Sequence, residues 1–521
     1  MKETVMQGKP YAGNPHVRFD EGAGASRHSG RSALLYNMRK QTWKAAVSAA
    51  AIAAGAAIPM AAKATTENIT FTTNGVTWRV RLEPEADSYL SSYGSVGNVP
   101  GTAMLGINTS CYNITDRDKL EYKAISNLNV SVDASLIPWQ FDYNGTHYTV
   151  TKIALGAFRQ NGTAAKLTGT VTIPDSVTEL RNSAFNNQQT LTGFSGGKNV
   201  KFWGNTTGAG IFPNCVNMLG VYPDMSQAVY VGDSIFSSSN KMTGNLVLSD
   251  MLKDVNYYAF QSTQISGTVV IPASVNTIGG DNATFGVFYN CPKLEAVWVR
   301  GKPTATSQTY TTVYAASFVR SCASMKMVLF GQNTKGASVN AMNGTQAGHR
   351  MLNGDSNVQV FVPANGYWTG LDVGGTNNKT RWYGPSEEFD LAINDTDMTA
   401  MFTPTTVNAL TNALSWASDF KTHFNLDAHI SVTNTLDLTG VTIDSAAVSG
   451  VTFDRLMFTA TTQAQLNDIL DTFPATTPIS IDPTGLTENM VIPETYNNVH
   501  VKTVPGVTIK RTTKGFMIIV K

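Results

Sequence analysis

The residue types best suited to metal or proton chemistry lie near the C-terminal end, where Asp427 stands between His423 and His429. Zinc-binding histidines on a helix recur four residues apart, which places both rings on one face. The two histidines here are six residues apart and do not meet that spacing. We therefore predict no metal site and interpret the three side chains as surface residues.

A second oxygen-rich stretch, Asn394-Asp395-Thr396-Asp397, precedes them in the chain. A calcium loop of the EF-hand type also needs a glycine and a distal acidic residue, and this stretch has neither. Aspartates beside a helix start commonly accept hydrogen bonds from its free N–H groups. We interpret Asp395 and Asp397 as caps of a short helix.

The chain carries no short catalytic or nucleotide-binding motif in a usable context. Paired catalytic carboxylates leave no short motif, so one alternative is a glycan-processing enzyme with its acids within 386–521. Charged residues make up 14% of the chain and the formal net charge is +1, which gives no basic face for nucleic acid. We predict no enzyme: no catalytic residue, no cofactor, and no nucleic-acid partner.

The cysteines are Cys111, Cys215, Cys291 and Cys322, and no two of them form a CxxC pair. The pattern therefore indicates neither a zinc site nor a disulfide framework. The last three occupy equivalent places in separate sequence repeats, where we expect them to act as small, buried, apolar fillers. A disulfide is the alternative, but stacked neighbours rarely meet the Cβ separation that it requires.

The elements that position these residues are repeats, each marked by one phenylalanine. The marker residues are spaced 24–30 residues apart and are Phe158, Phe185, Phe212, Phe236, Phe260, Phe288 and Phe318. An aliphatic residue follows most of them at a similar distance: Leu167, Leu191, Leu219, Met242, Ile265, Leu294 and Met325. A fixed period with one short strand per unit is the signature of a solenoid, in which stacking buries what no unit buries alone.

The clearest unit spans Leu167 to Leu191. Its predicted core residues are Leu167, Val171, Ile173, Val177, Leu180, Phe185 and Leu191. The segments TVTIPDSVTEL, SAFNNQQTL, TVVIPASVNTI, VFYNCPKL and SFVRSCASM resemble the BspA-like leucine-rich repeat surface protein family. The resemblance covers about residues 140–385 and is weakest at 192–250. It places Cys291 and Cys322 at the family's buried cysteine position and implies bacterial surface adhesion to protein, matrix or cell partners.

The flanks of the repeats differ from them in pattern. Residues 65–145 alternate as strands around Asn74-Gly75 and Asn144-Gly145, which predicts a small antiparallel cap. Helical spacing over Val407–Phe424 and Gln463–Phe473, between strand-like segments, predicts an α+β domain. The predicted fold is a β-rich leucine-rich-repeat solenoid (146–385) with an N-terminal β cap (65–145) and a C-terminal α+β domain (386–521).

The N-terminal stretch has the pattern of a secretory signal. Met38-Arg39-Lys40 precedes an alanine-rich apolar run, and Ala62-Lys63-Ala64 supplies the small residues of a cleavage site. We predict a signal peptide at 38–64 and interpret 1–37 as an upstream extension, with Met38 as the true start, or as a disordered tail. The apolar run is too short for an integral membrane span, so we predict a secreted or cell-surface protein.

The strands also predict an outward-facing row, because the middle residue of each V-x-I points away from the core. Its members are Thr172, Tyr222, Val247, Val270, Trp298, Leu329 and Phe361. This row is more apolar than a solvated sheet face. Either flanking parts cover it, or it binds a protein or glycan partner, of host origin if the family resemblance holds. The function predicted is non-covalent recognition; the alternative is a structural, self-associating surface component.

Overall fold

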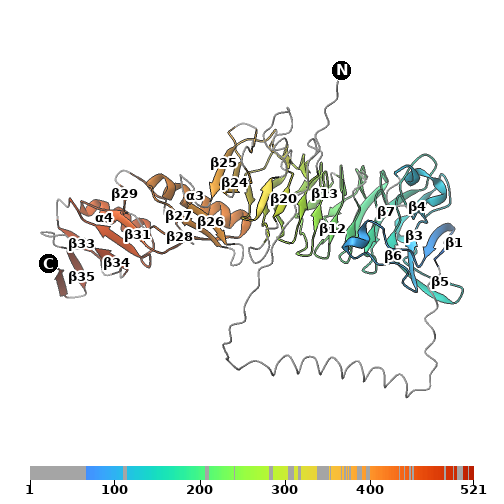
Figure 1. Ribbon diagram of the computed structural model, residues 1–521, viewed down its shortest axis with the longest axis horizontal. Coiled ribbons are helices and arrows are strands. Elements are labelled where there is room, and N and C mark those ends of the chain that lie inside the picture. The colour runs from blue at the N-terminus through green and yellow to red at the C-terminus, as the bar shows by residue number, and fades with distance from the viewer. Residues whose placement is uncertain are drawn as a thin grey trace, which may run out of the picture. The chain divides into compact units, whose positions relative to one another are not determined.

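Each repeat folds into a coil with strands on two of its sides, as a computed structural model of the chain shows (Figure 1). The structure describes residues 66–520 with gaps, the longer ones being 110–113, 206–209, 281–285, 303–309, 337–350, 384–389, 395–398 and 502–508. Shorter gaps lie mainly after residue 314. The predicted signal peptide and the stretch before it lie outside the described residues. The domain boundaries stay a prediction.

One side of the coils forms a long sheet that runs through the whole solenoid. Its parallel strands pair in chain order: β6 (Thr146–Ile153), β8 (Glu179–Leu180), β10 (Phe202–Trp203), β12 (Tyr230–Val231), β14 (Asp254–Val255), β17 (Thr277–Ile278), β20 (Thr311–Val313) and β23 (Thr334–Gly336). Most are only two residues long. We predicted one strand per unit, and this second strand was missed because a two-residue strand shows no alternation.

The other side carries the predicted V-x-I strands in three shorter parallel sheets, which together we call the segmented face. The first holds β4 (Ser131–Asp133), β7 (Lys166–Ile173) and β9 (Leu191–Gly196). The second holds β11 (Gly220–Val221), β13 (Met242–Gly244) and β15 (Gln264–Ile265). The third holds β16 (Gly267–Ile271), β19 (Leu294–Val299), β22 (Met327–Phe330), β24 (Gln359–Pro363) and β25 (Lys379–Tyr383).

The predicted phenylalanine ladder fills the interior. All seven marker rings are buried, and so are all seven predicted core residues of the unit from Leu167 to Leu191. Successive rings from Phe158 to Phe288 stack with centroids 5.1–6.5 Å apart. Phe318 breaks the stack and meets Phe288 edge-on at 79°. The reason is register: β18 (Phe288–Tyr289) pairs with β21 (Val319–Arg320), so Val319, not Phe318, is the structural equivalent of Phe288.

The N-terminal β region extends the long sheet rather than standing apart from it. Its strands are β1 (Glu67–Thr73), β2 (Val76–Leu82), β3 (Thr102–Leu105) and β5 (Gln140–Tyr143). The two predicted Asn-Gly hairpins are present, with positive φ at both residues of each turn, as tight hairpin turns require. Pairing is not antiparallel throughout, because β3 joins β6 in parallel and so leads into the solenoid.

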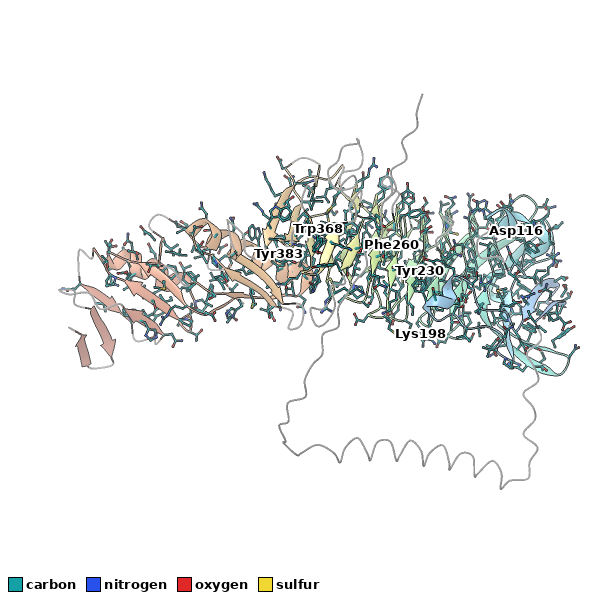
Figure 2. All side chains as sticks on the ribbon, in the orientation of Figure 1. Asp116, Lys198, Tyr230, Phe260, Trp368 and Tyr383 are labelled. Atoms are coloured by element: carbon teal, nitrogen blue, oxygen red, sulfur yellow. The ribbon has the colours of Figure 1, made fainter. Side chains whose placement is uncertain are left out.

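Short 3₁₀ helices fill the connections of this region: η1 (Leu90–Tyr93), η2 (Ile114–Asp118), η3 (Leu120–Tyr122) and η4 (Ala134–Leu136). η1 lies within the loop that joins β2 to β3. Leu90 of this helix packs on Phe202 and Tyr230, which face outward from the long sheet. The loop therefore covers the first part of that sheet, where Figure 2 labels Tyr230.

Residues after 386 combine helices and strands, as predicted. The first sheet holds β26 (Asp390–Asn394), β27 (Thr399–Thr403), β28 (Asp427–Ile430) and β30 (Val451–Phe453). The second holds β29 (Thr435–Asp437), β31 (Leu456–Thr459), β32 (Ile479–Asp482) and β34 (Val499–Val501). The third holds β33 (Met490–Ile492), β35 (Ile509–Thr513) and β36 (Phe516–Val520). Parallel pairing dominates these sheets, which the sequence pattern did not indicate.

The two helices match their predicted bounds to within one residue: α3 (Val407–Phe424) and α4 (Gln463–Thr472). Each begins after a threonine whose hydroxyl accepts a hydrogen bond from the first turn, Thr406 from Ala409 and Thr462 from Gln465. α3 ends at Asn425 in the left-handed conformation, which asparagine tolerates. Its buried side packs both on β28 and on β16 and β19 of the solenoid.

Candidate functional site

The segmented face divides into a covered part and an open part. The covered part carries Trp298, Leu329 and Phe361, which lie side by side across β19, β22 and β24. All three are fully buried and belong to an apolar cluster with α3, separate from the interior of the solenoid. They do point away from the solenoid core, as the strand pattern predicted. Of the two predicted outcomes for these three residues, cover by a flanking part is the correct one and an exposed binding row is wrong, because α3 lies over them.

Ring contacts show how α3 seals this part of the sheet. Phe361 meets Phe420 at a centroid distance of 4.9 Å and Trp416 at 5.4 Å. Trp298 meets Phe424 at 5.9 Å. Residues four apart recur on one side of a helix, which is why Trp416, Phe420 and Phe424 present a continuous surface to the strands.

Two other members of the predicted row need separate treatment. Val270, the neighbour of Trp298 on β16, is half-buried and packs against the α3 cluster, so it marks the boundary of the cover. Tyr222 points into the core: its ring meets Phe236 edge-on, and its hydroxyl accepts a hydrogen bond from the Gln264 backbone at 3.0 Å. The orientation of Tyr222 was predicted one residue out of register, and such a slip exchanges the two faces of a strand.

Because of this register error, the predicted row named Tyr222 in place of its neighbour Val221, which faces outward. Val221 is 69% exposed, and Val247 of the next coil, a predicted member of the row, is 57% exposed. Leu219 is 56% exposed although it was predicted to be a core residue. Met218 occupies the buried position instead. The stretch from Met218 to Tyr222 is apolar except for Gly220, so the sequence carried no alternation that could have fixed its register.

The open row consists of these three aliphatic side chains and two hydroxyl residues. Thr172 and Ser195 are direct neighbours on β7 and β9, with their hydroxyl oxygens 2.9 Å apart. Gly193 bridges to Leu219, so Val221 falls beside Ser195, and Val221 pairs with Thr243 on the other side. The open row is thus a strand face with an apolar centre and a hydroxyl-bearing margin, a composition suited to non-covalent contact.

The histidines of the C-terminal region do not form one site. His423 is buried on α3, contrary to the prediction, because it lies on the side of the helix that meets the strands. His429 instead pairs with Asp454, Nε2 to Oδ1 at 2.7 Å, and this hydrogen bond lowers the pKa of Asp454. Asp427 is exposed and pairs with Lys421. Asp395 and Asp397 lie outside the described residues. Within the described part, no three His, Cys, Asp or Glu side chains could hold a metal ion together.

The three described cysteines are free and buried, as expected of ladder residues. They are more than apolar fillers, because each thiol donates to the backbone carbonyl of a phenylalanine one coil earlier. The Sγ–O distances are 3.1 Å for Cys215 to Phe185, 3.1 Å for Cys291 to Phe260 and 3.2 Å for Cys322 to Phe288. Burial raises the pKa of the Cys215 thiol to about 12, which keeps it protonated as a donor at neutral pH.

A pocket of about 520 Å³ lies beside α4, in the region where the alternative prediction placed an enzyme site. Asp468 and Asp471 line it, together with Thr472 and the apolar residues Ile469 and Phe473. Both aspartates are exposed, and Thr472 donates its hydroxyl to the backbone carbonyl of Asp468 at 2.6 Å. The pocket thus holds two carboxylates three residues apart on one solvated helix side.

Parallel coils, a phenylalanine ladder and two strand-bearing sides define a leucine-rich-repeat solenoid. Residues 151–295 and 207–347 match the model of the BspA type Leucine rich repeat region, in six copies. The chain therefore contains a BspA-type leucine-rich repeat region, as its motifs predicted. No curated protein matches the chain.

Two solved structures align over much of their length. A leucine rich cell surface protein from Faecalibacterium prausnitzii is 15% identical, with 61% of this chain and 96% of that chain covered and a TM-score of 0.27. A leucine-rich repeat protein from Bacteroides ovatus is 13% identical, with 77% and 95% covered and a TM-score of 0.21. TM-scores this low carry no argument about the present chain. Among the described residues, no helix has the length and hydropathy to cross a bilayer.

Proposed function

We propose that this chain is a secreted or surface-displayed bacterial leucine-rich repeat protein that binds a protein partner through the open row. The observation that carries the proposal is the exposure of three aliphatic side chains on neighbouring coils of the segmented face: Leu219, Val221 on β11, and Val247 in the segment that follows β13. Apolar side chains that gather at one exposed place are characteristic of interaction surfaces. Solenoids present such surfaces as extended, rigid faces.

A protein partner fits the open row better than a glycan. Three aliphatic side chains offer no hydrogen bonds and no aromatic ring for stacking on a sugar. They offer apolar area that a partner can exclude from water, surrounded by the hydroxyls of Thr172, Ser195 and Thr243. Such a core and rim are the ordinary anatomy of a protein interface.

The test uses the predicted mature chain, beginning at Thr65, against an array of extracellular matrix and cell-surface proteins. We expect a specific protein ligand, and at least tenfold weaker binding after the double substitution Val221→Ser and Val247→Ser. Val96→Ser is the matched control, because Val96 is a 65% exposed valine in the η1 loop, away from the open row. Equal binding by the double variant would overturn the assignment of the open row.

Self-association is the alternative outcome of the same experiment. A structural surface component would bury the open row against a second copy of the chain. Sedimentation velocity over a hundredfold concentration range distinguishes the two functions: a monomer at all concentrations supports a foreign partner. A dimer that the double serine variant abolishes would instead assign the row to self-association.

Secretion is proposed on the pattern of residues 38–64 alone. N-terminal sequencing of the exported protein should return Thr65 as the first residue. Recovery of peptides from residues 1–37 in the precursor would overturn Met38 as the start of translation.

A further inference from the structure

A polar groove, lined in part by turn residues of the first coils, has an excess of positive charge. Its volume is about 470 Å³, and its cationic residues are Arg117 of η2 and Arg159. The remaining lining comes from three successive coils: Asn186, Asn187, Pro213, Asn214, Ser234 and Ser237. No aliphatic side chain besides the proline lines it, so the groove differs in kind from the apolar open row.

The charges in the groove do not balance. Asp118 is shared by the two guanidinium groups: its Oδ1 lies 2.6 Å from Nε of Arg159, and its Oδ2 lies 3.9 Å from Nε of Arg117. Asp116 pairs with Lys119 at 2.8 Å and so is engaged elsewhere. One carboxylate therefore faces two arginines, which leaves one positive charge for a ligand.

A third cation lies beneath the arginines. The buried Lys123 ammonium donates to the backbone carbonyl of Arg117 and, at 3.0 Å, to that of Gly156. Burial and the nearby charge of Arg159 lower the pKa of Lys123 to about 7, and burial and Arg159 also lower the pKa of Arg117. Positive charges that raise one another's free energy in this way are stabilised when an anion binds.

Arg117 also has a hydrogen-bond donor that lacks an acceptor in the described part of the chain. Its Nε is buried from solvent and makes no hydrogen bond within the described residues. A buried N–H without an acceptor is destabilising, and an anion that enters the groove would supply the acceptor. A planar guanidinium recognises carboxylates through two parallel hydrogen bonds.

We propose that this groove binds a carbohydrate that bears a carboxylate, with the carboxylate between Arg117 and Arg159. The amides and hydroxyls of the following coils are spaced about 4.8 Å apart, as stacked strands are, and meet the hydroxyls of the sugar rings. Asn186 and Asn214 offer both donors and acceptors, which polyhydroxylated ligands require. The site is independent of the open row.

The experiment is isothermal titration of the mature chain with a galacturonate trisaccharide. The neutral trisaccharide maltotriose and inorganic phosphate are the comparison ligands. We expect the galacturonate to bind at least tenfold more tightly than either, and its affinity to fall as salt is raised. Equal binding of maltotriose would overturn the role of the arginines, equal binding of phosphate would overturn recognition of the sugar, and no binding of galacturonate would overturn the site.

Arg117→Gln should weaken galacturonate binding at least tenfold. Arg117→Lys, which keeps the charge but loses the planar donor pair, should weaken it severalfold and guards against misfolding of the neutral variant. Lys198→Gln is the control, because Lys198 is an exposed cation in a salt bridge with Asp175, and Figure 2 places it away from Asp116. Unchanged galacturonate binding by both arginine variants would overturn the proposal, as would an equal loss in the Lys198 control.

Discussion

The two sides of the solenoid are each covered over one part and open over the other, but the covers differ in chemistry. On the segmented face, α3 lies over the last coils through aromatic rings and aliphatic side chains. On the long sheet, the η1 loop lies over the first coils through an apolar contact of Leu90 with Phe202 and Tyr230 and through a cluster of buried charges. The comparison shows that one repeat scaffold accepts both an apolar cover and a cover that adds buried charges to apolar contacts, which we call the ionic cover.

The ionic cover centres on Glu179, which lies on the outward side of the long sheet. Its carboxylate accepts from Lys152 at 3.0 Å, from Arg181 at 2.7 Å and from the Ser95 hydroxyl of the loop at 2.8 Å. Asp87 of the loop lies 3.8 Å from Arg181. Because these groups are buried, each depends on its partners for solvation, and the loop is specified by polar geometry.

Disrupting the apolar contact between α3 and the segmented face should cause the largest loss of stability. Trp298→Ala removes a fully buried ring between β19 and α3, so it should lower the free energy of unfolding by about 3–5 kcal/mol. Chemical denaturation measures the loss. A change of less than about 1 kcal/mol would contradict the burial of Trp298 and return it to the exposed row that the sequence predicted.

Removing the central carboxylate of the ionic cover should cause the second-largest loss of stability. Glu179→Ala leaves Lys152 and Arg181 without their shared carboxylate, and removing one partner of a buried pair costs roughly 3–5 kcal/mol. The value should lie at the lower end, because the η1 loop can open and admit water. Proteolysis would detect this opening as new cleavage between residues 84 and 99, and protection equal to that of the unsubstituted chain would argue against it.

Lowering the pH should open the η1 loop but leave α3 in place. Burial alone would raise the pKa of Glu179, but Arg181 and Lys152 outweigh burial and hold the pKa below its ordinary value of 4.5. The folded state therefore binds fewer protons than the unfolded chain near pH 4, and stability falls as the pH falls through that range. Hydrogen exchange should show the η1 loop opening below about pH 4.5, while α3 stays protected.

The matched control for this pH effect is an exposed carboxylate. Glu295 forms a solvent-exposed pair with Lys326 at 3.5 Å. Glu295→Gln should leave the acid opening of the η1 loop unchanged, whereas Glu179→Gln should reduce its pH dependence to the part that comes from Glu85 of the same loop, whose pKa the hydrogen bond from Arg81 lowers. An identical pH profile in all three proteins would exclude Glu179 as the group responsible.

The smallest effect on stability is expected in the open row. Val221→Ser and Val247→Ser should each change the free energy of unfolding by no more than about 0.5 kcal/mol, since both side chains are more than half exposed. The same denaturation series measures it. A loss as large as that for Trp298→Ala would show that the open row is part of a core, which would leave no free surface for a partner.

Much of the fold was predictable because repetition makes local patterns reinforce one another. The phenylalanine spacing identified the ladder, and the alternation in TVTIP identified Val171 and Ile173 as core and Thr172 as exposed. Helix α3 was predictable from apolar spacing and its threonine cap. Less was predictable at positions where a strand is two residues long, since one residue of slip reversed the orientation of Tyr222 and Val221.

By itself, then, the sequence determined the repeat, its interior and, in the strands longer than two residues, the direction in which the side chains point. Only the tertiary structure decided which outward side chains meet water, because that depends on α3 and the η1 loop, which come from distant parts of the chain. Trp298 and Val247 hold the same place in the repeat pattern. One is buried and the other is exposed because a helix more than a hundred residues after Trp298 packs on the first and does not extend to the second.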